Sequence, residues 1–194
     1  MDTVEALKKA KIVQEEYFKY SLNQGYPVSL GDMAHVVQLY AEVDVHRIIS
    51  VGYGAEHIFG RLERSEGGAE IVLSSGLNEC HKRYVIIKEL SHLIIDTDDS
   101  FTKDFNGLVT GLIDDSYQQI DHDDALQSEN IAHYVACELL LPFKLRQGLI
   151  DSLASGDTTY YKIAKNYLIP ETVVKSILHG PMHKALHVIM DKVG

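Results

Sequence analysis

Four ionisable side chains lie close together in an otherwise apolar segment, residues 83–96. Lys88, His92 and Asp96 follow one another at intervals of four residues. Glu89 lies on the adjoining flank, so a helix would place all four side chains toward one side. The residues around them are mainly isoleucine, leucine and valine, which predicts that this helix is buried. Because buried charges are costly unless they are paired or bind a metal, the segment predicts a polar cluster that lines a cleft.

A second segment, residues 124–141, offers the same chemistry. Glu129 and His133 are four residues apart and share a face if this segment is a helix. Two helices that each carry an acid and a histidine can together supply the imidazole and carboxylate ligands that suit zinc. One hypothesis is a metal held by His92, Glu129 and either His133 or Asp96. The other hypothesis is a site without metal, in which these groups form salt bridges.

The two segments resemble the ImmA/IrrE family of zincin-like metallopeptidases. Residues 88–92, Lys-Glu-Leu-Ser-His, look like the H-E-x-x-H helix of zincins. Residues 129–142 are similar to the family signature E-x-x-A-N-x-F-A-x-E-L-L-M-P. The resemblance covers residues 25–180 and implies a zincin-like fold with a zinc cofactor. It also implies a bacterial or phage regulatory protein that acts on a helix-turn-helix repressor in stress-response or mobile-element control.

The resemblance assigns roles to individual residues. Glu89 matches the general base, His92 the second zinc histidine and Glu129 the third zinc ligand. An edge strand of the sheet would hold the partner's backbone by strand addition, and the metal would polarise the scissile carbonyl. The resemblance therefore predicts that the two helices are antiparallel neighbours, with the side chains of His92 and Glu129 within about 5 Å of each other.

Three features depart from the family pattern. Lys88 stands where the first zinc histidine is expected, and a protonated amine is no ligand and opposes a metal ion in the same cavity. His133 replaces an asparagine or aspartate, and the two motifs are farther apart in the chain. Lys88 can instead take the metal's electrostatic place by pairing with Glu89, Glu129 or Asp96. We therefore favour a pseudo-peptidase that binds its partner, with Glu89 and Lys88 at the catalytic positions. The alternative is an active zinc endopeptidase.

The remaining segments must hold these two helices in place. Apolar spacing predicts helices over residues 4–20, 30–40, 83–95 and 124–141, and near 159–167, 170–178 and 182–190. Short β-branched segments punctuated by glycine predict an antiparallel meander of three strands at 48–51, 58–62 and 69–73. The fold class is therefore α+β, a zincin-like domain over residues 1–142 with a small antiparallel sheet packed on helices. Residues 143–194 are expected to form a helical C-terminal cap.

Composition narrows the class of partner. The 194 residues carry 18 lysines and arginines against 28 acids, a formal charge of -10, whereas proteins that coat duplex DNA are basic. Residues 163–178 have the apolar spacing of a helix-turn-helix, but their second helix offers few polar side chains for reading DNA. We therefore expect two helices that pack on the core. We expect a protein partner, such as a helix-turn-helix repressor, and no direct contact with nucleic acid.

The chain also lacks the usual marks of membrane or secreted proteins. No apolar run approaches the roughly 20 residues that cross a bilayer, and the first residues do not resemble a secretory signal. Two cysteines, Cys80 and Cys137, are too few for a disulfide framework. We therefore expect a cytoplasmic protein without membrane contact.

Overall fold

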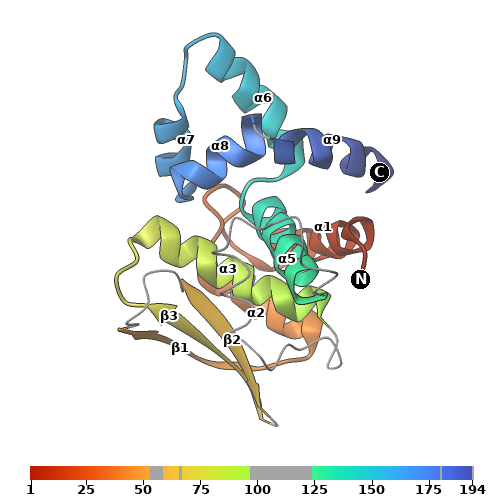
Figure 1. The fold of residues 1–194 in the computed structure, drawn as a ribbon, viewed down its shortest axis with the longest axis vertical. Helices are drawn as coiled ribbons and strands as arrows, with labels where there is room; N and C mark the ends of the chain where they lie inside the picture. The colour runs from red at the N-terminus through yellow and green to blue at the C-terminus, as the bar shows by residue number, and fades with distance from the viewer. Residues whose placement is uncertain (53–58, 66, 97–123, 180, 194) are drawn as a thin grey trace.

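The computed structural model describes residues 1–52, 59–65, 67–96, 124–179 and 181–193. The described elements form an α+β fold in which a small sheet lies on a layer of helices (Figure 1). In chain order they are α1 (Thr3–Tyr20), α2 (Leu30–Ala41), β1 (Val45–Val51), β2 (Gly60–Ser65), β3 (Gly68–Ser74), α3 (Glu79–Ile95), α5 (Asp124–Leu140), α6 (Phe143–Ala154), α7 (Tyr160–Tyr167), α8 (Glu171–His179) and α9 (Pro181–Val193).

Helix α3 is the centre of the fold. The strands β2 and β3 pack on one side of it, and α2 and α5 pack on others (Figure 1). Asn78 caps its first turn, because the side-chain oxygen accepts a hydrogen bond from the backbone N–H of His81. The turns that follow are buried, which confirms the expectation drawn from their apolar sequence.

The sheet is mixed, so the predicted antiparallel meander was wrong. Its strand order is β1-β3-β2, with β1 parallel and β2 antiparallel to the central strand β3. A hairpin joins β2 to β3 between Ser65 and Gly68, while β1 pairs with the other edge of β3. Alternating apolar residues indicate which face of a strand is buried but not which strand is its neighbour, and that is why the sequence did not predict this order.

A glycine allows β2 to approach α3 closely. A Cβ atom at Gly60 would overlap the side chain of Val85 on α3. The absence of a side chain here brings the edge strand against the helix that carries the polar cluster. Two residues further along β2, Leu62 packs on the hydrophobic core.

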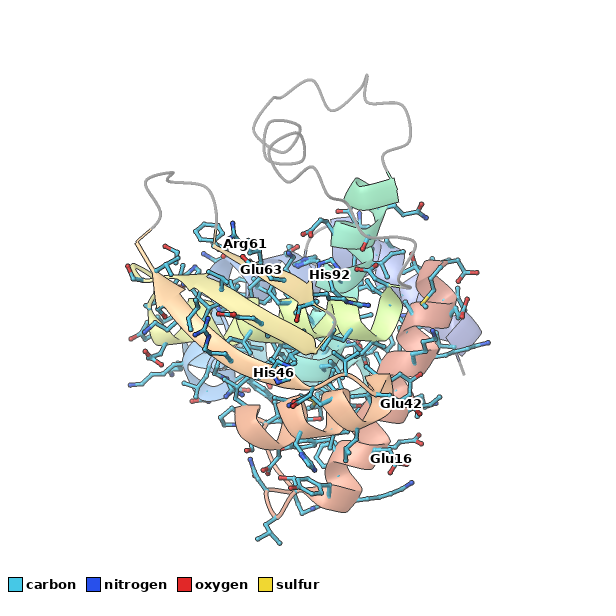
Figure 2. All side chains as sticks on the ribbon, turned by 90° about the horizontal axis from the view of Figure 1, so that it is seen from below. Glu16, Glu42, His46, Arg61, Glu63 and His92 are labelled. Atoms are coloured by element: carbon cyan, nitrogen blue, oxygen red, sulfur yellow. The ribbon has the colours of Figure 1, made fainter. Side chains whose placement is uncertain are left out.

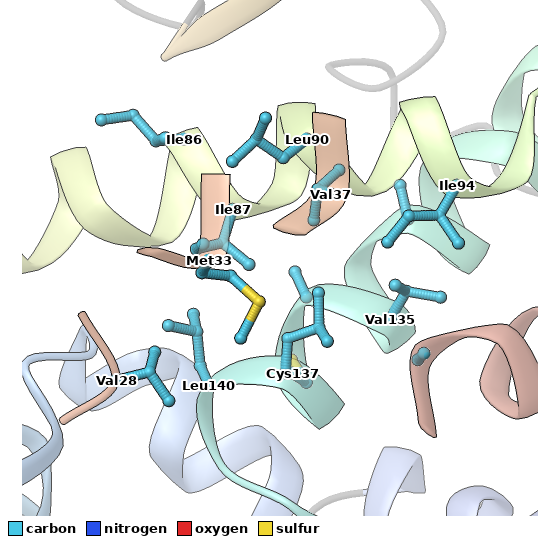
Figure 3. Packing of buried hydrophobic residues seen from close by; sticks show 14 of the residues in the cluster. Val28, Met33, Val37, Ile86, Ile87, Leu90, Ile94, Val135, Cys137 and Leu140 are labelled. Atoms are coloured by element: carbon cyan, nitrogen blue, oxygen red, sulfur yellow. The ribbon is translucent and has the colours of Figure 1, made fainter. Parts of the chain in front are cut away.

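A single cluster of buried apolar residues joins the helices to the sheet. Side chains from α2, α3 and α5 meet at Met33, Ile87 and Leu140 (Figure 3). The same cluster includes Ile163 of α7 and Val174 of α8, so the C-terminal helices share the core of the first part of the chain. Removal of these side chains from water is the main stabilisation of the fold.

The C-terminal part contains one helix that was not predicted. Helix α5 ends at Leu140, before Pro142 as expected, and α6 then begins at Phe143. The apolar residues Leu145, Leu149 and Leu153, spaced by four, are the signal that could have identified it. The segment with helix-turn-helix cadence forms α7 and α8, whose apolar sides are buried as a packing pair.

A buried ion pair between Arg146 and Glu138 connects α6 to α5. Arg146 is 1% exposed, and its Nη2 atom lies 3.0 Å from Oε2 of Glu138. Its Nε also donates to the carbonyl of Leu141, and Glu138 accepts from the backbone N–H of Phe143. The turn at residues 141–143 is therefore held by hydrogen bonds from both sides.

No helix within the described ranges has both the length and the hydropathy that a membrane crossing requires.

Candidate functional site

The two helices that carry the motifs lie side by side and run in opposite directions. Tyr84, in the first half of α3, contacts His133 of α5, whereas Asp96, directly after α3, contacts Ser128, which lies earlier in α5. The Nε2 atom of His92 lies 3.1 Å from Oε1 of Glu129. This distance confirms the prediction that the two side chains approach within about 5 Å.

The amine of Lys88 lies between two carboxylates. Its Nζ atom is 2.5 Å from Oε2 of Glu129 and 3.3 Å from Oε1 of Glu89. The lysine side chain is 20% exposed, and that of Glu89 only 4%. Burial alone would lower the pKa of Lys88, but the charges of Glu89 and Glu129 outweigh burial and raise it. Lys88 is therefore an ammonium ion at neutral pH.

His92 has a carboxylate neighbour at each of its ring nitrogens. Nδ1 donates to Oδ2 of Asp96 over 2.7 Å, and Nε2 faces the carboxylate of Glu129. Burial would lower the pKa of His92, but its hydrogen bond to Asp96 and the nearby carboxylate of Glu129 raise it from 6.5 to about 9. The imidazole is thus a second cation within the cluster.

Glu129 is the carboxylate shared by the two cations. Burial would raise its pKa, but His92 and then Lys88 oppose this effect and lower the pKa to about 2. Each oxygen of Glu129 faces a different cation, Oε1 facing His92 and Oε2 facing Lys88. One side chain of α5 therefore binds two successive turns of α3.

Asp96 lies behind the ring of His92 and is itself held in place. Its Oδ1 atom accepts a hydrogen bond from Oγ of Ser128 over 2.6 Å. Arg64 of β2 donates through Nη2 to the carbonyl oxygens of His92 and Asp96, at 3.3 and 3.4 Å. These bonds connect the edge strand to the end of α3, and Figure 2 shows Glu63 of β2 and His92 on the same side of the molecule.

His133 belongs to a separate pair one turn from the cluster. Its Nδ1 atom is bonded to the hydroxyl of Tyr84, and the two rings meet edge to face. Burial, followed by the charge of Lys88, lowers the pKa of His133 to about 4, so the imidazole is neutral. Burial also raises the pKa of Tyr84 well above 10, so both partners of this bond are neutral at neutral pH.

These residues do not fit a catalytic zinc ion. A zinc site needs three protein ligands around one point, and here only His92 Nε2 and Glu129 converge. The position beside them holds the ammonium of Lys88, while Asp96 lies behind the imidazole and His133 bonds to Tyr84. Among the described residues, no group of three or more His, Cys, Asp or Glu side chains is arranged to hold a metal ion.

The sequence identified most of the cluster but not the residues that support it. Lys88 pairs with Glu89 and Glu129, Glu129 also pairs with His92, and His92 pairs with Asp96. Ser128 was missed although it stands directly before Glu129. Arg64 was missed because it lies on a strand, 28 residues from His92, and no local pattern connects the two.

No protein-family model matches the chain, and no curated protein is significantly similar to it in sequence.

The raised pKa of His92 predicts how stability depends on pH. Because the folded protein binds this proton more tightly, the contribution is complete below about pH 6.5 and is lost as the pH rises through about 9. The shift from 6.5 to about 9 corresponds to about 3 kcal/mol. Urea unfolding of wild type between pH 6 and about 9.5 should show this loss.

A His92→Gln variant should show no such loss over the same pH range. A His179→Gln variant, which changes an exposed histidine of α8, is the matched control and should keep the wild-type dependence. A His92→Gln variant that loses stability with rising pH as steeply as wild type would contradict the prediction.

Proposed function

We propose that this protein is a metallopeptidase-like regulatory protein in which a cluster of ion pairs takes the place of the zinc ion. It binds a protein partner, such as a helix-turn-helix repressor, without cutting it. The observation that carries the proposal is the position of the Lys88 ammonium between Glu89 and Glu129, the residues that resemble the base and a zinc ligand.

The chemistry of the cluster supports a binding role rather than hydrolysis. A general base must accept a proton from water, but Glu89 is 4% exposed and its carboxylate faces a permanent cation. Both oxygens of Glu129 are also occupied by cations. The groups that would activate water are therefore satisfied by one another.

The edge strand beside the cluster supports a partner held by its backbone. The strand β2 is at the edge of the sheet in the described part of the chain, and Arg64 anchors it to the end of α3. An exposed strand edge offers N–H and C=O groups to an extended segment of another protein. The partner would lie along β2, beside the helix that carries Lys88.

The net charge is consistent with a basic repressor as the partner, and the cysteine content is consistent with a cytoplasmic location. A charge of -10 disfavours nucleic acid and favours a basic protein, as repressors that bind DNA are. Cys80 and Cys137 are both free thiols, which is consistent with the reducing cytoplasm. We therefore place the protein in the cytoplasm.

The second candidate function is an active zinc endopeptidase. The observation that favours it is the Nε2 atom of His92, which is buried and has no aligned hydrogen-bond partner among the described residues. It faces Glu129, so a metal that displaced Lys88 would find two ligands already in place. Metal content separates the two candidates.

Wild-type protein should therefore contain no stoichiometric zinc after dialysis against zinc-free buffer, as measured by elemental analysis. The Lys88→His variant restores two histidines on one helical face and removes the opposing charge, so it should bind about one zinc per chain. Adding Glu89→Gln to this variant should leave the zinc bound, because the expected role of Glu89 concerns water and not the ion.

The matched control is Lys162→His, which adds a histidine at an exposed lysine of α7. It should gain no zinc. Stoichiometric zinc in wild type, unchanged by Lys88→His, would mean that the ligands lie elsewhere and that the pseudo-peptidase proposal is wrong.

The first step of the partner test is to sequence the neighbouring genes, and a helix-turn-helix repressor found there is the partner to be used. The two proteins should co-elute from a sizing column, and the repressor should stay intact after incubation with the chain and zinc. Duplex DNA is the control ligand, and filter binding at about 0.15 M salt should show only weak, non-specific association. Cleavage of the repressor, separate elution or a specific nanomolar DNA complex would each contradict the proposal.

A further inference from the structure

An exposed groove lies between α1 and α2, away from the ion cluster. It encloses about 390 Å³ and is lined by Glu16, Lys19, Tyr20, Val36, Leu39 and Tyr40. Leu39 is 64% exposed and Tyr20 is 53% exposed, although both are large apolar residues. Figure 2 shows Glu16, at this groove, well apart from His92.

The same face also carries a side chain that could fill such a groove. Ile12 is 47% exposed and lies one helical turn before Glu16 on α1. A face that holds both a groove and an exposed apolar side chain can pack against a copy of itself, because a two-fold axis places each side chain opposite the other copy's groove.

The charges of this face point to a second copy as the occupant. The chain as a whole has a charge of -10, so most of its surface would repel an identical molecule. Helix α1 differs, because its four lysines, Lys8, Lys9, Lys11 and Lys19, offset its three glutamates, Glu5, Glu15 and Glu16. Glu16 and Lys19, which pair at 2.6 Å on the rim, are also able to pair across an interface in both directions.

We propose that the α1–α2 face is a homodimer interface, in which two helical hairpins pack about a two-fold axis as a layer of four helices. Leu39 and Tyr20 of each copy form the wall of the groove, and Ile12 of the other copy enters it. The interface leaves Lys88 and β2 free, so a dimer would present two separate partner sites.

The size of the face sets the expected strength of the dimer. Helix α1 has 18 residues, so it is about 27 Å long, and two helices side by side are about 20 Å wide. The face thus covers about 500 Å² per copy and about 1,000 Å² in total, near the lower limit for specific interfaces. A reversible dimer of micromolar Kd is the expectation.

Sedimentation velocity of the full chain from about 5 to about 500 µM tests the proposal. Wild type should shift from 21.7 kDa toward twice that mass as its concentration rises. Leu39→Glu and Ile12→Glu should each raise the dimer Kd about tenfold or more, because each places a charge in the apolar centre of the interface. Both positions are exposed, and circular dichroism verifies that the variants remain folded.

The matched control is Val188→Glu on α9, where a residue of similar exposure, 61%, lies outside this face. It should dimerise like wild type. A wild type that stays monomeric throughout would overturn the proposal, and so would a dimer that Leu39→Glu and Ile12→Glu leave unchanged. A monomer that instead binds an amphipathic helix of another protein in the groove would equally overturn it.

Discussion

The arrangement of α3 and α5 depends on one partly buried ammonium group, that of Lys88. Lys88 lies in a helix that is apolar on most sides, and its charge would be costly there without partners. Glu89 comes from the same helix and Glu129 from the neighbouring one, so the charge is satisfied only when the two helices lie together in this register. Loss of either carboxylate would leave a buried charge incompletely paired, which costs more than the pair contributes.

The other polar groups of the cluster continue the chain of ion pairs and hydrogen bonds that begins at Lys88. Glu129 joins Lys88 to His92, His92 joins Glu129 to Asp96, and Asp96 accepts from Ser128. Cations and carboxylates alternate along this line, so every charged group has at least one opposite neighbour. The line also reaches the sheet, since Arg64 binds the backbone beside His92 and Asp96. The edge strand β2 and the ion cluster are therefore joined by hydrogen bonds, so a change in one would be transmitted to the other.

The sequence predicted the helices and the members of the cluster because both are local properties. Spacing by four residues identifies a helical face, and it placed Lys88, His92 and Asp96 together. The strand order could not be predicted in this way, because the neighbours of a strand depend on the path of the chain between strands. Helix α6 was not predicted although Leu145, Leu149 and Leu153 recur every four residues, because Gly148 lowers the helix propensity of this short segment. The role of Arg64 is a contact between distant segments, which only the folded structure reveals.

The buried ion pair of Arg146 and Glu138 determines whether the first part of the chain can be separated from the C-terminal helices. Glu138 belongs to the motif segment of α5, whereas its partner lies beyond Pro142 in the C-terminal part. A chain that ended at residue 142 would leave this carboxylate without its cation, and would expose apolar residues that α7 and α8 cover. The signature-like segment therefore shares its hydrogen bonds and its apolar core with the C-terminal helices and is not an independent folding unit.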